Sequence, residues 1–319
     1  MKIAIIGTGK IAQKAYFPLL LTWPDLEISI VYSRTQKSID EAKKTWGFKK
    51  TTTNIQEVLD HQPDAAFVIS SNESHFDFCK LLLENGVDVY AEKPLTIHSQ
   101  EARALSKVAE QHGRVLAVGF NRRYALLNLQ AKEIFGDRQI QTAIIQKHRS
   151  FMTYNTMFEQ YIDDNIHQID LMRFFCGDVK ARSTAMQRLD GKIAGASSIM
   201  DIPNGGLAVL SISNAAGSWL EHVALHGEGL SVYVDAFQRL TVIKDDHHTV
   251  YGTDRAGKWI RDLRERGFEG EIQHFFECVT SRQTPRTSAL EAAKTQELVE
   301  DLVKLTGENL DYLGNFQIN

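Results

Sequence analysis

Short apolar runs alternate with helix-like segments over the first 120 residues. The runs are rich in β-branched and aromatic residues, which is typical of buried strands. They are KIAII (2–6), EISIVYS (27–33), AAFVIS (65–70), VDVYAEKP (87–94) and VLAVGFN (115–121). The segments between them carry helix signals, such as Ser38 as an N-cap and Gly47 as a helix end. Strands that alternate with helices predict a parallel sheet covered by helices on both faces.

The pattern changes after Asn121. A helix is expected over 124–135, a strand over 141–148, a helix around 163–170 and a last helix over 290–307. Between them, residues 180–252 are strand-rich with glycine-containing turns, and the alternation in these strands favours a sheet with one exposed face. We therefore predict two domains, 1–120 and 121–319, the second an α+β domain with a large, mostly antiparallel open sheet. Its open face predicts a homodimer or homotetramer.

Composition narrows the class of protein. The 319 residues are 43% hydrophobic and 24% charged, with a formal net charge of −4, which is typical of a soluble globular protein and argues against a nucleic-acid partner. No apolar run approaches the ~20 residues that span a bilayer, and MKIAIIGTGK does not resemble a signal peptide. Cys79, Cys176 and Cys278 are far apart in the sequence and odd in number. They fit reduced thiols in a cytoplasmic protein without a membrane partner.

The hexapeptide GTGKIA (7–12) lies where the first strand meets the first helix. In this G-x-G-x-x-A pattern Gly7 permits the tight turn, Gly9 lets the backbone approach a pyrophosphate, and Ala12 allows close helix–strand packing. A small-residue turn without a ligand is the alternative. The β/α context favours a Rossmann doubly wound domain, with a phosphate site formed by Gly7, Thr8, Gly9, Lys10 and Ile11.

The end of the second strand bears on the choice of cofactor. An acid there would bind the adenosine ribose 2′-hydroxyl of NAD, but the sequence has Ser33, Arg34 and Thr35. Hydroxyls and a guanidinium suit a 2′-phosphate, so NADP is the preferred cofactor. NAD remains the alternative, because Arg34 can stack on its adenine.

Lys93 ends the fifth strand, in AEKPL (91–95), at the sheet edge where doubly wound folds bind ligands. A partly buried lysine there can exchange a proton or hydrogen bond with a substrate hydroxyl. The alternative is a strand-end lysine whose ammonium reaches water.

The octet DDNIHQID (163–170) holds three acids and one histidine. On an α-helix Asp163, His167 and Asp170 fall within a stripe roughly 60° wide, separate from an isoleucine stripe that would face the core. A metal site, a solvated stripe and an acid–base pair compete. The glycine loop and Lys93 favour Asp163 orienting His167 as the general acid/base. Asp164 lies off the stripe, and Asp170 is expected to cap or pair within the helix.

These motifs occur in the order typical of one family. GTGKIA, SSNESH (70–75), EKP (92–94), VGFNRR (118–123) and DDNIHQID together resemble the Gfo/Idh/MocA family of NAD(P)-dependent oxidoreductases, and look closest to its MviM-like branch. The resemblance implies a Rossmann domain, an open-sheet second domain, and interconversion of an alcohol and a carbonyl on a sugar, inositol or similar polyol.

The resemblance also implies site residues. Lys93, His167 and Asp163 match the catalytic positions, and the Lys93–Pro94 bond is expected to be cis. The cofactor would contact Ser70, Ser71, Asn72, His75, Glu92, Lys93 and Asn121. Asn165 stands where relatives carry a glycine, which predicts a loss of backbone freedom beside the substrate.

Three polar residues are candidate substrate contacts, namely Arg123, Lys147 and Tyr154. For the basic cluster KHRS (147–150), a solvated strand end is the alternative. The rival to the enzyme as a whole is a dinucleotide-binding sensor that performs no chemistry.

Overall fold

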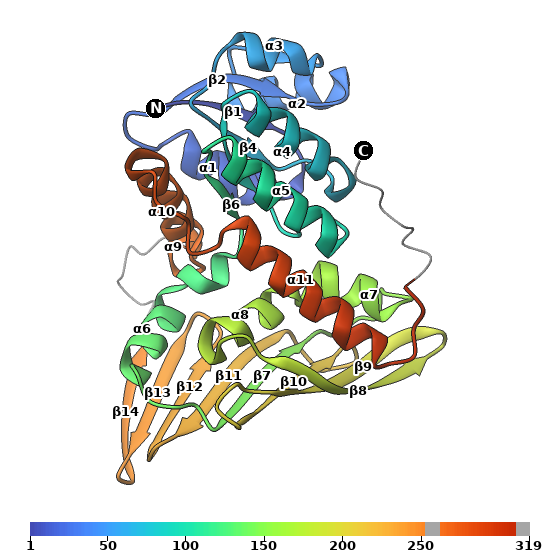
Figure 1. The fold of residues 1–319 in the computed structure, drawn as a ribbon, viewed down its shortest axis with the longest axis vertical. Helices are drawn as coiled ribbons and strands as arrows, with labels where there is room; N and C mark the ends of the chain where they lie inside the picture. The colour runs from blue at the N-terminus through green and yellow to red at the C-terminus, as the bar shows by residue number, and fades with distance from the viewer. Residues whose placement is uncertain (253–261, 311–319) are drawn as a thin grey trace. The chain divides into compact units, whose positions relative to one another are not determined.

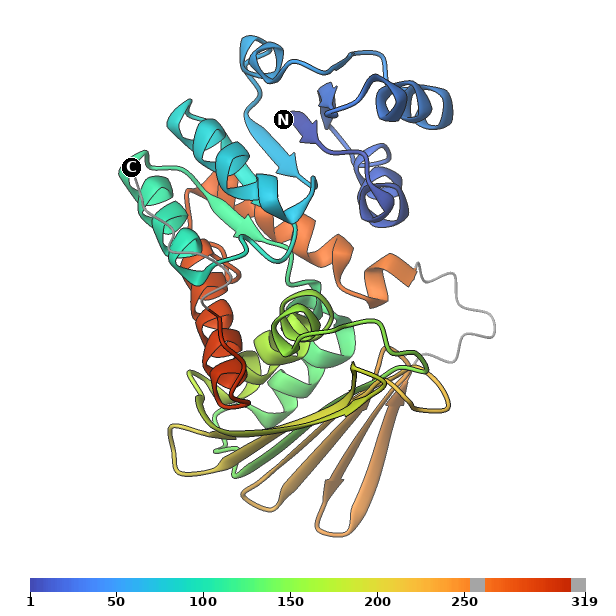
Figure 2. The same ribbon diagram turned by 90° about the vertical axis from the view of Figure 1, so that its right-hand side faces the viewer.

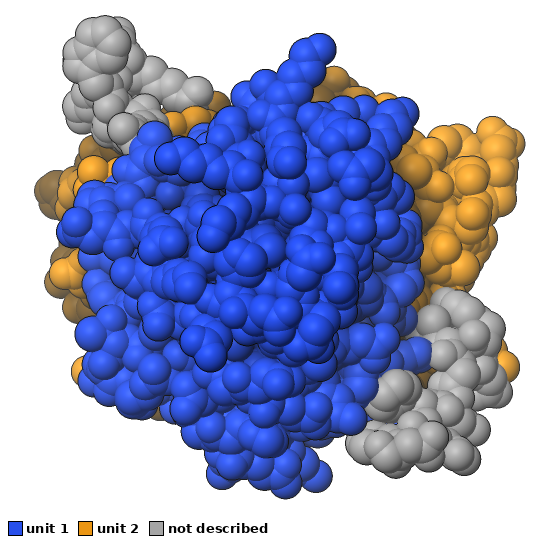
Figure 3. All heavy atoms as spheres, turned by 90° about the horizontal axis from the view of Figure 1, so that it is seen from above, with its two compact units in different colours: residues 1–120, 268–293, 316–319 blue, residues 121–267, 294–315 orange. Residues whose placement is uncertain are grey.

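The computed structural model describes residues 1–252 and 262–310, which form two compact units. The first unit contains residues 1–120 and 268–293, and the second contains residues 121–252, 262–267 and 294–310 (Figure 3). Residues 268–293, which the sequence pattern grouped with the second domain, thus belong to the first unit.

The first unit is built on a six-stranded parallel sheet, as the alternating pattern predicted (Figure 1). Its strand order is β3 (Thr51–Thr52), β2 (Glu27–Tyr32), β1 (Lys2–Ile6), β4 (Ala65–Val68), β5 (Asp88–Ala91) and β6 (Leu116–Val118). Every residue of β4 and β5 is buried, because helices cover both faces of the sheet. The chain order reverses beside β1, and doubly wound sheets bind dinucleotides at such a point.

The helices of this unit, apart from the last, begin and end near the predicted signals. They are η1 (Ala12–Tyr16), α1 (Phe17–Leu20), α2 (Gln36–Trp46), α3 (Ile55–Asp60), η2 (Asn72–Ser74), α4 (His75–Glu84), α5 (Ser99–Gln111) and α10 (Phe268–Ser281). The N-cap of α2 is Thr35 rather than Ser38, since the Thr35 hydroxyl accepts a hydrogen bond from the Ser38 N–H at 3.3 Å. Gly47 ends α2 in the left-handed conformation, with φ of 73°.

Helix α10 has no counterpart among the predicted elements. It packs the Phe275 ring against Phe67 and Tyr90 of the sheet, with centroids 5.6 and 5.7 Å apart. This return of the chain completes the core of the first unit.

The second unit contains an eight-stranded sheet in which only β7 and β10 run parallel. The order is β14 (His247–Gly252), β13 (Arg239–Lys244), β12 (Leu230–Asp235), β11 (Leu220–Gly227), β7 (Thr142–His148), β10 (Leu207–Ser213), β9 (Lys192–Asp201) and β8 (Lys180–Leu189). The fold class predicted from the sequence, a Rossmann sheet followed by a large and mostly antiparallel sheet, is confirmed.

Helices cover one face of this second sheet (Figure 2). Of these, α6 (Leu126–Phe135) contacts β12 and β13, and α8 (Ile166–Cys176) contacts β7 and β10. The remaining helices of the unit include η3 (Asn121–Tyr124), α7 (Met157–Glu159), η4 (Gln160–Asn165) and α9 (Asp262–Glu265); α11 (Ala289–Lys304) follows later in the chain. On the opposite face Ile144, Val209 and Ile199 are paired across three neighbouring strands. Ile199 is 36% exposed and the other two are half-buried, so this face presents an apolar row.

Of the helices that the structure describes, none has the length and apolar character needed to cross a bilayer.

Candidate active site

The loop after β1 has the geometry of a phosphate-binding turn. Gly7 has φ of 110°, and a Cβ atom there would lie 2.5 Å from the Ile69 carbonyl oxygen. A Cβ atom on Gly9 would meet no protein atom within 4 Å, so this side of the loop is open to a ligand. The first N–H groups of the helix that follows have no intrahelical acceptors, and such groups bind phosphate.

A cavity of about 610 Å³ opens beside this loop. Its lining is Gly7, Thr8, Gly9, Lys10, Ile11, Tyr32, Ser33, Arg34, Thr35, Ser38, Ile69, Ser70, Ser71, Ser74 and Phe78. These residues include two cations, Lys10 and Arg34, and no acid. The charge of this lining therefore fits an anionic nucleotide, and the residues present are compatible with a dinucleotide cofactor.

The residues at the end of β2 differ in their accessibility. Ser33 is buried and its hydroxyl accepts a hydrogen bond from Thr8 at 3.2 Å, while the Thr35 hydroxyl caps α2. Arg34 is exposed at the edge of the cavity. Of the three residues predicted to contact the adenosine ribose, Arg34 therefore has the freest side chain.

The SSNESH segment follows β4, and its residues divide into two groups. Ser70 and Ser71 line the cavity, and Asn72 is half-buried. His75 is fully buried, where Nδ1 lies 2.9 Å from the Pro94 carbonyl oxygen and Nε2 lies 3.2 Å from that of Ser70. Burial lowers the pKa of His75, which favours the neutral ring, and a neutral ring donates to only one of these two carbonyl oxygens.

Glu92 and Lys93 follow β5 at the carboxyl edge of the parallel sheet. Tyr16 donates a hydrogen bond to Glu92 Oε1 at 2.8 Å, and the Lys93 N–H donates to Glu92 Oε2 at 2.7 Å. Lys93 is half-buried, and the Lys93–Pro94 peptide bond is cis, as the resemblance implied.

The octet does not lie on a regular α-helix. Residues Gln160–Asn165 form a π-helical segment, and the α-helix α8 begins only at Ile166. An angle of 100° per residue does not hold through such a segment. The predicted polar stripe is wrong in its exposure, because Asp163 is exposed whereas His167 and Asp170 are buried.

Asp170 forms a buried ion pair with Arg123. The Arg123 guanidinium donates to both carboxylate oxygens at 2.7 Å, and the Thr295 hydroxyl donates to Oδ1 at 3.0 Å. The expectation that Asp170 caps or pairs within its own helix is therefore wrong. The predicted contact of Arg123 with a substrate stays a prediction.

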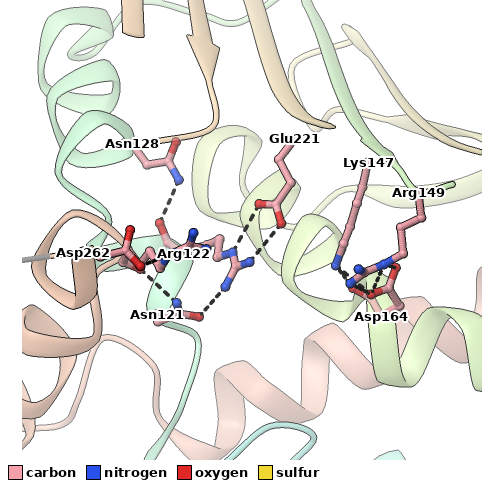
Figure 4. Close-up of polar contacts among 9 residues, drawn as sticks. Asn121, Arg122, Asn128, Lys147, Arg149, Asp164, Glu221 and Asp262 are labelled. Atoms are coloured by element: carbon pink, nitrogen blue, oxygen red, sulfur yellow. Dashed lines mark hydrogen bonds and ion pairs between the residues drawn. The ribbon is translucent and has the colours of Figure 1, made fainter. Parts of the chain in front are cut away.

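Asp164 forms ion pairs with two cations, Lys147 of strand β7 and Arg149 directly after that strand (Figure 4). Lys147 Nζ lies 3.0 Å from Asp164 Oδ1 and also donates to the Asp164 carbonyl oxygen. Arg149 Nε lies 2.8 Å from Asp164 Oδ2. KHRS is thus not a solvated strand end, because Lys147 is only 4% exposed.

The charges of this cluster depend on burial. Burial lowers the pKa of Lys147 to about 8, although the charges of Glu221 and Asp164 oppose the change. Burial alone would raise the pKa of Asp164, but the hydrogen bond from Arg149 and the Lys147 charge outweigh it, and the pKa falls. Asp164 is therefore a carboxylate at neutral pH.

A second ion pair lies close to the first (Figure 4). Arg122 donates to both carboxylate oxygens of Glu221, at 3.3 and 2.9 Å. It also donates to Asn121 Oδ1 at 3.1 Å, while Asn121 Nδ2 donates to the Arg266 carbonyl oxygen at 2.9 Å. Asn121 is 1% exposed, and its predicted contact with the cofactor stays a prediction. The sequence analysis missed Arg149, Arg122 and Glu221, although the clustering of cations in NRR and KHR was a usable signal.

Asp163 has Tyr154 as a partner. The Tyr154 hydroxyl donates to Asp163 Oδ2 at 2.6 Å, and burial followed by this hydrogen bond raises the pKa of Tyr154. Tyr154 is thus a neutral donor that holds the predicted orienting acid. His167 lies four residues later on α8, in the second unit, whereas Lys93 lies in the first. Their action on one substrate remains the prediction made from the sequence.

Asn165 has a backbone that needs no glycine. Its φ of −103° and ψ of −2° are accessible to any residue, so Asn165 is accommodated without strain, and the loss of backbone freedom relative to a glycine stays a prediction. Its side chain accepts a hydrogen bond from Gln160 Nε2 at 2.7 Å, and Gln160 Oε1 accepts one from Asn214 at 2.6 Å. The Asn165 side chain therefore fixes a buried polar network.

Within residues 1–252 and 262–310, no group of three or more His, Cys, Asp or Glu side chains is arranged to hold a metal ion.

Comparison with known proteins agrees with this geometry. Residues 1–120 match the model of the Gfo/Idh/MocA oxidoreductase family with an NAD-binding Rossmann fold. The putative oxidoreductase YceM of Salmonella typhimurium is 28% identical over 307 residues, which cover 95% of this chain and 97% of that protein. The scyllo-inositol 2-dehydrogenase (NAD(+)) of Bacillus subtilis is 23% identical and covers 93% and 92% of the two chains.

A solved structure extends the likeness to the whole chain. The dehydrogenase MviM from Clostridium difficile has a TM-score of 0.85 and 26% sequence identity, covering 94% of this chain and 97% of its own. The Rossmann unit thus matches the model of an NAD-binding oxidoreductase family, and nearly the full length of the chain is similar to proteins named as oxidoreductases and dehydrogenases. The chain therefore resembles the Gfo/Idh/MocA oxidoreductases in both units.

Proposed function

We propose that this protein is an NADP-preferring dehydrogenase or reductase acting on an alcohol/carbonyl pair of a sugar, inositol or similar polyol. The cavity beside Gly7 and Gly9 supports the proposed use of a dinucleotide cofactor, because its lining has two cations and no acid. The inositol dehydrogenase of Bacillus subtilis, similar over nearly the full length, supports the substrate class.

The preference for NADP rests on Arg34. An acid at the end of β2 would repel a 2′-phosphate, whereas an exposed guanidinium at the cavity edge binds phosphate through a planar fork. NAD binds the same loop without that contact. Arg34→Ala should therefore weaken NADP binding by roughly 10-fold and leave NAD binding nearly unchanged.

The bound nicotinamide would accept or supply a hydride, and three residues of the chain would handle the proton. His167 is proposed as the general acid/base that exchanges a proton with the reacting hydroxyl. Asp163, held by Tyr154, would orient the His167 ring, and Lys93 would hydrogen-bond the reacting oxygen.

The test measures hydride transfer and cofactor affinity in parallel. The wild type should change the nicotinamide absorbance with at least one member of a panel of sugars and polyols. Lys93→Ala and His167→Ala should lower kcat by ~100-fold or more while the cofactor Kd stays within about twofold. Lys180→Ala, an exposed lysine of β8, is the matched control and should keep full activity.

A dinucleotide-binding sensor gives a different result. In that case the cofactor binds, no panel member is turned over, and neither substitution changes any measured property except through stability. Turnover that survives both Lys93→Ala and His167→Ala would contradict the roles proposed for these residues.

The open face of the second sheet supports a homodimer or homotetramer. Ile144, Val209 and Ile199 form an apolar row on the face that the helices leave uncovered (Figure 2). Ile199→Glu should shift the protein to a smaller species in light scattering. An unchanged mass for Ile199→Glu would show that the row lies outside any interface.

A further inference from the structure

The Glu92 carboxylate is held on both oxygens by buried donors. The Tyr16 hydroxyl donates to Oε1 at 2.8 Å, and the Lys93 N–H donates to Oε2 at 2.7 Å. Glu92 is 7% exposed and Tyr16 is fully buried. Two donors on one carboxyl group favour its ionised form, which carries a negative charge at this sheet edge.

A second layer fixes Tyr16. Its hydroxyl oxygen lies 2.9 Å from that of Tyr90, which is also fully buried. Burial is the first cause that raises the pKa of both phenols, and carboxylate charges add to it: Glu92 next for Tyr16, and Glu271 next for Tyr90. Both phenols therefore stay neutral and act as donors.

Gly119 leaves the space that this pair of hydroxyls needs. A Cβ atom on Gly119 would lie 2.9 Å from the Tyr90 hydroxyl, 3.1 Å from that of Tyr16 and 3.5 Å from Glu92 Cα. The backbone directly after β6 thus comes close to the two tyrosines because position 119 has no side chain.

Glu92 lies at the sheet edge where the nicotinamide half of a dinucleotide would bind. The cavity at the ends of β1 and β2 accounts for one half of a dinucleotide, and the chain order reverses between β1 and β4. A dinucleotide bound across such a reversal places its other half over the ends of β4 and β5. Glu92 follows β5 directly, so it lies on the side of the sheet edge that the nicotinamide would occupy.

The two redox forms of the cofactor differ there by one charge. The oxidised nicotinamide ring carries a positive charge that the reduced ring lacks. A carboxylate beside the ring in a partly buried site would favour the cationic ring by on the order of 10-fold in affinity.

We propose that Glu92, held by Tyr16 and the Lys93 N–H, strengthens binding of the oxidised cofactor relative to the reduced one. Tyr16 is a positioning residue in this arrangement, since it acts through Glu92. The inference rests on the proposed function, because it requires a nicotinamide cofactor at this sheet edge.

The test is a pair of equilibrium Kd values, for the oxidised and the reduced cofactor, measured by titration calorimetry without substrate. Glu92→Gln keeps the shape of the side chain and removes the charge. The ratio of the oxidised Kd to the reduced Kd should rise ~10-fold in Glu92→Gln. It should rise by a smaller factor, ~3-fold, in Tyr16→Phe, which keeps the ring and removes the donor.

Gly9→Ala is the matched control. A Cβ atom there would meet no protein atom but would occupy the open space beside the loop where the phosphates would bind, so it should weaken both redox forms by the same factor and leave their ratio unchanged. A melting temperature for each variant separates a loss of fold from a loss of charge.

The outcomes separate this inference from the proposed function. If both forms bind and Glu92→Gln leaves the ratio at the wild-type value, the charge effect is refuted and the proposed function stands. If Tyr16→Phe lowers the melting temperature but leaves the ratio at the wild-type value, Tyr16 has no positioning role. If the wild type binds neither redox form, the proposed function itself fails.

Discussion

Lys147 should make the stability of the protein depend on pH in an alkaline window. Burial lowers its pKa from 10.5 to about 8, against the opposing charges of Glu221 and Asp164 and with the help of Arg122 and Arg149. Between about pH 8 and 10.5 the amine is neutral in the folded chain and protonated in the unfolded chain. The unfolded state then binds more protons, so the free energy of unfolding rises with pH in this window.

The magnitude follows from the two pKa values. At ~1.4 kcal/mol per pKa unit, the difference between 10.5 and about 8 corresponds to about 3 kcal/mol, most of it gained between pH 7 and 10. Asp164 and Glu221 have lowered pKa values and stay ionised throughout, so they add no slope there.

The assay compares urea unfolding of the wild type and Lys147→Met at several pH values from 7 to 10. Other groups titrate in both proteins, so the quantity of interest is the difference between the two free energies of unfolding. That difference should move in favour of the wild type by about 2 to 3 kcal/mol across the range. Lys180→Met, which removes an exposed lysine, should produce no such change.

A flat difference between wild type and Lys147→Met would refute the reasoning, since it would mean that Lys147 keeps its ordinary pKa in the folded protein. A difference that falls with pH would show that the ion pair with Asp164 outweighs burial.

Two further predictions concern the buried ion pair and the glycine loop. Asp170→Asn should lower the free energy of unfolding by about 3 to 5 kcal/mol, because the Arg123 charge stays buried without its carboxylate. Circular dichroism in denaturant measures this loss. The double variant Asp170→Leu with Arg123→Met should recover most of it, because it removes both charges. Gly7→Ala should lower the melting temperature, because its Cβ would meet the Ile69 carbonyl oxygen at 2.5 Å. Gly9→Ala should leave the melting temperature unchanged and weaken cofactor binding ~10-fold. Equal changes in melting temperature for the two variants would contradict the roles assigned to these glycines.

The first unit was largely predictable because its signals are local. Buried parallel strands are short apolar runs, helix ends carry caps such as Asn54 and Gly47, and the phosphate turn needs glycine at fixed positions. Helix α10 was missed because its role depends on contacts such as that of Phe275 with Phe67, which lie more than 200 residues apart. No local pattern records such a contact.

The octet shows why the candidate site was harder to predict. Its acids looked solvent-exposed because charged residues usually are, yet Asp164 and Asp170 are buried by cations from other elements. These partners, Lys147 and Arg123, come from strand β7 and from η3. A π-helical segment also shifts the angular positions that a helical wheel assigns. The burial of these acids is therefore explained by their pairing with Lys147 and Arg123, and their angular positions on an ideal helix do not explain it.

Asn165 shows how the region beside the octet is held in place. Its backbone has a conformation that any residue adopts, so the part of this residue that matters to the fold is its side chain. That side chain begins a hydrogen-bonded chain that runs through Gln160 to Asn214, and all three residues are buried. Buried, mutually bonded amides resist rearrangement, because moving one leaves the others without partners. The segment that carries Asp163 and precedes His167 is therefore held rigidly by contacts that are distant in the sequence, and no local pattern in the octet records them.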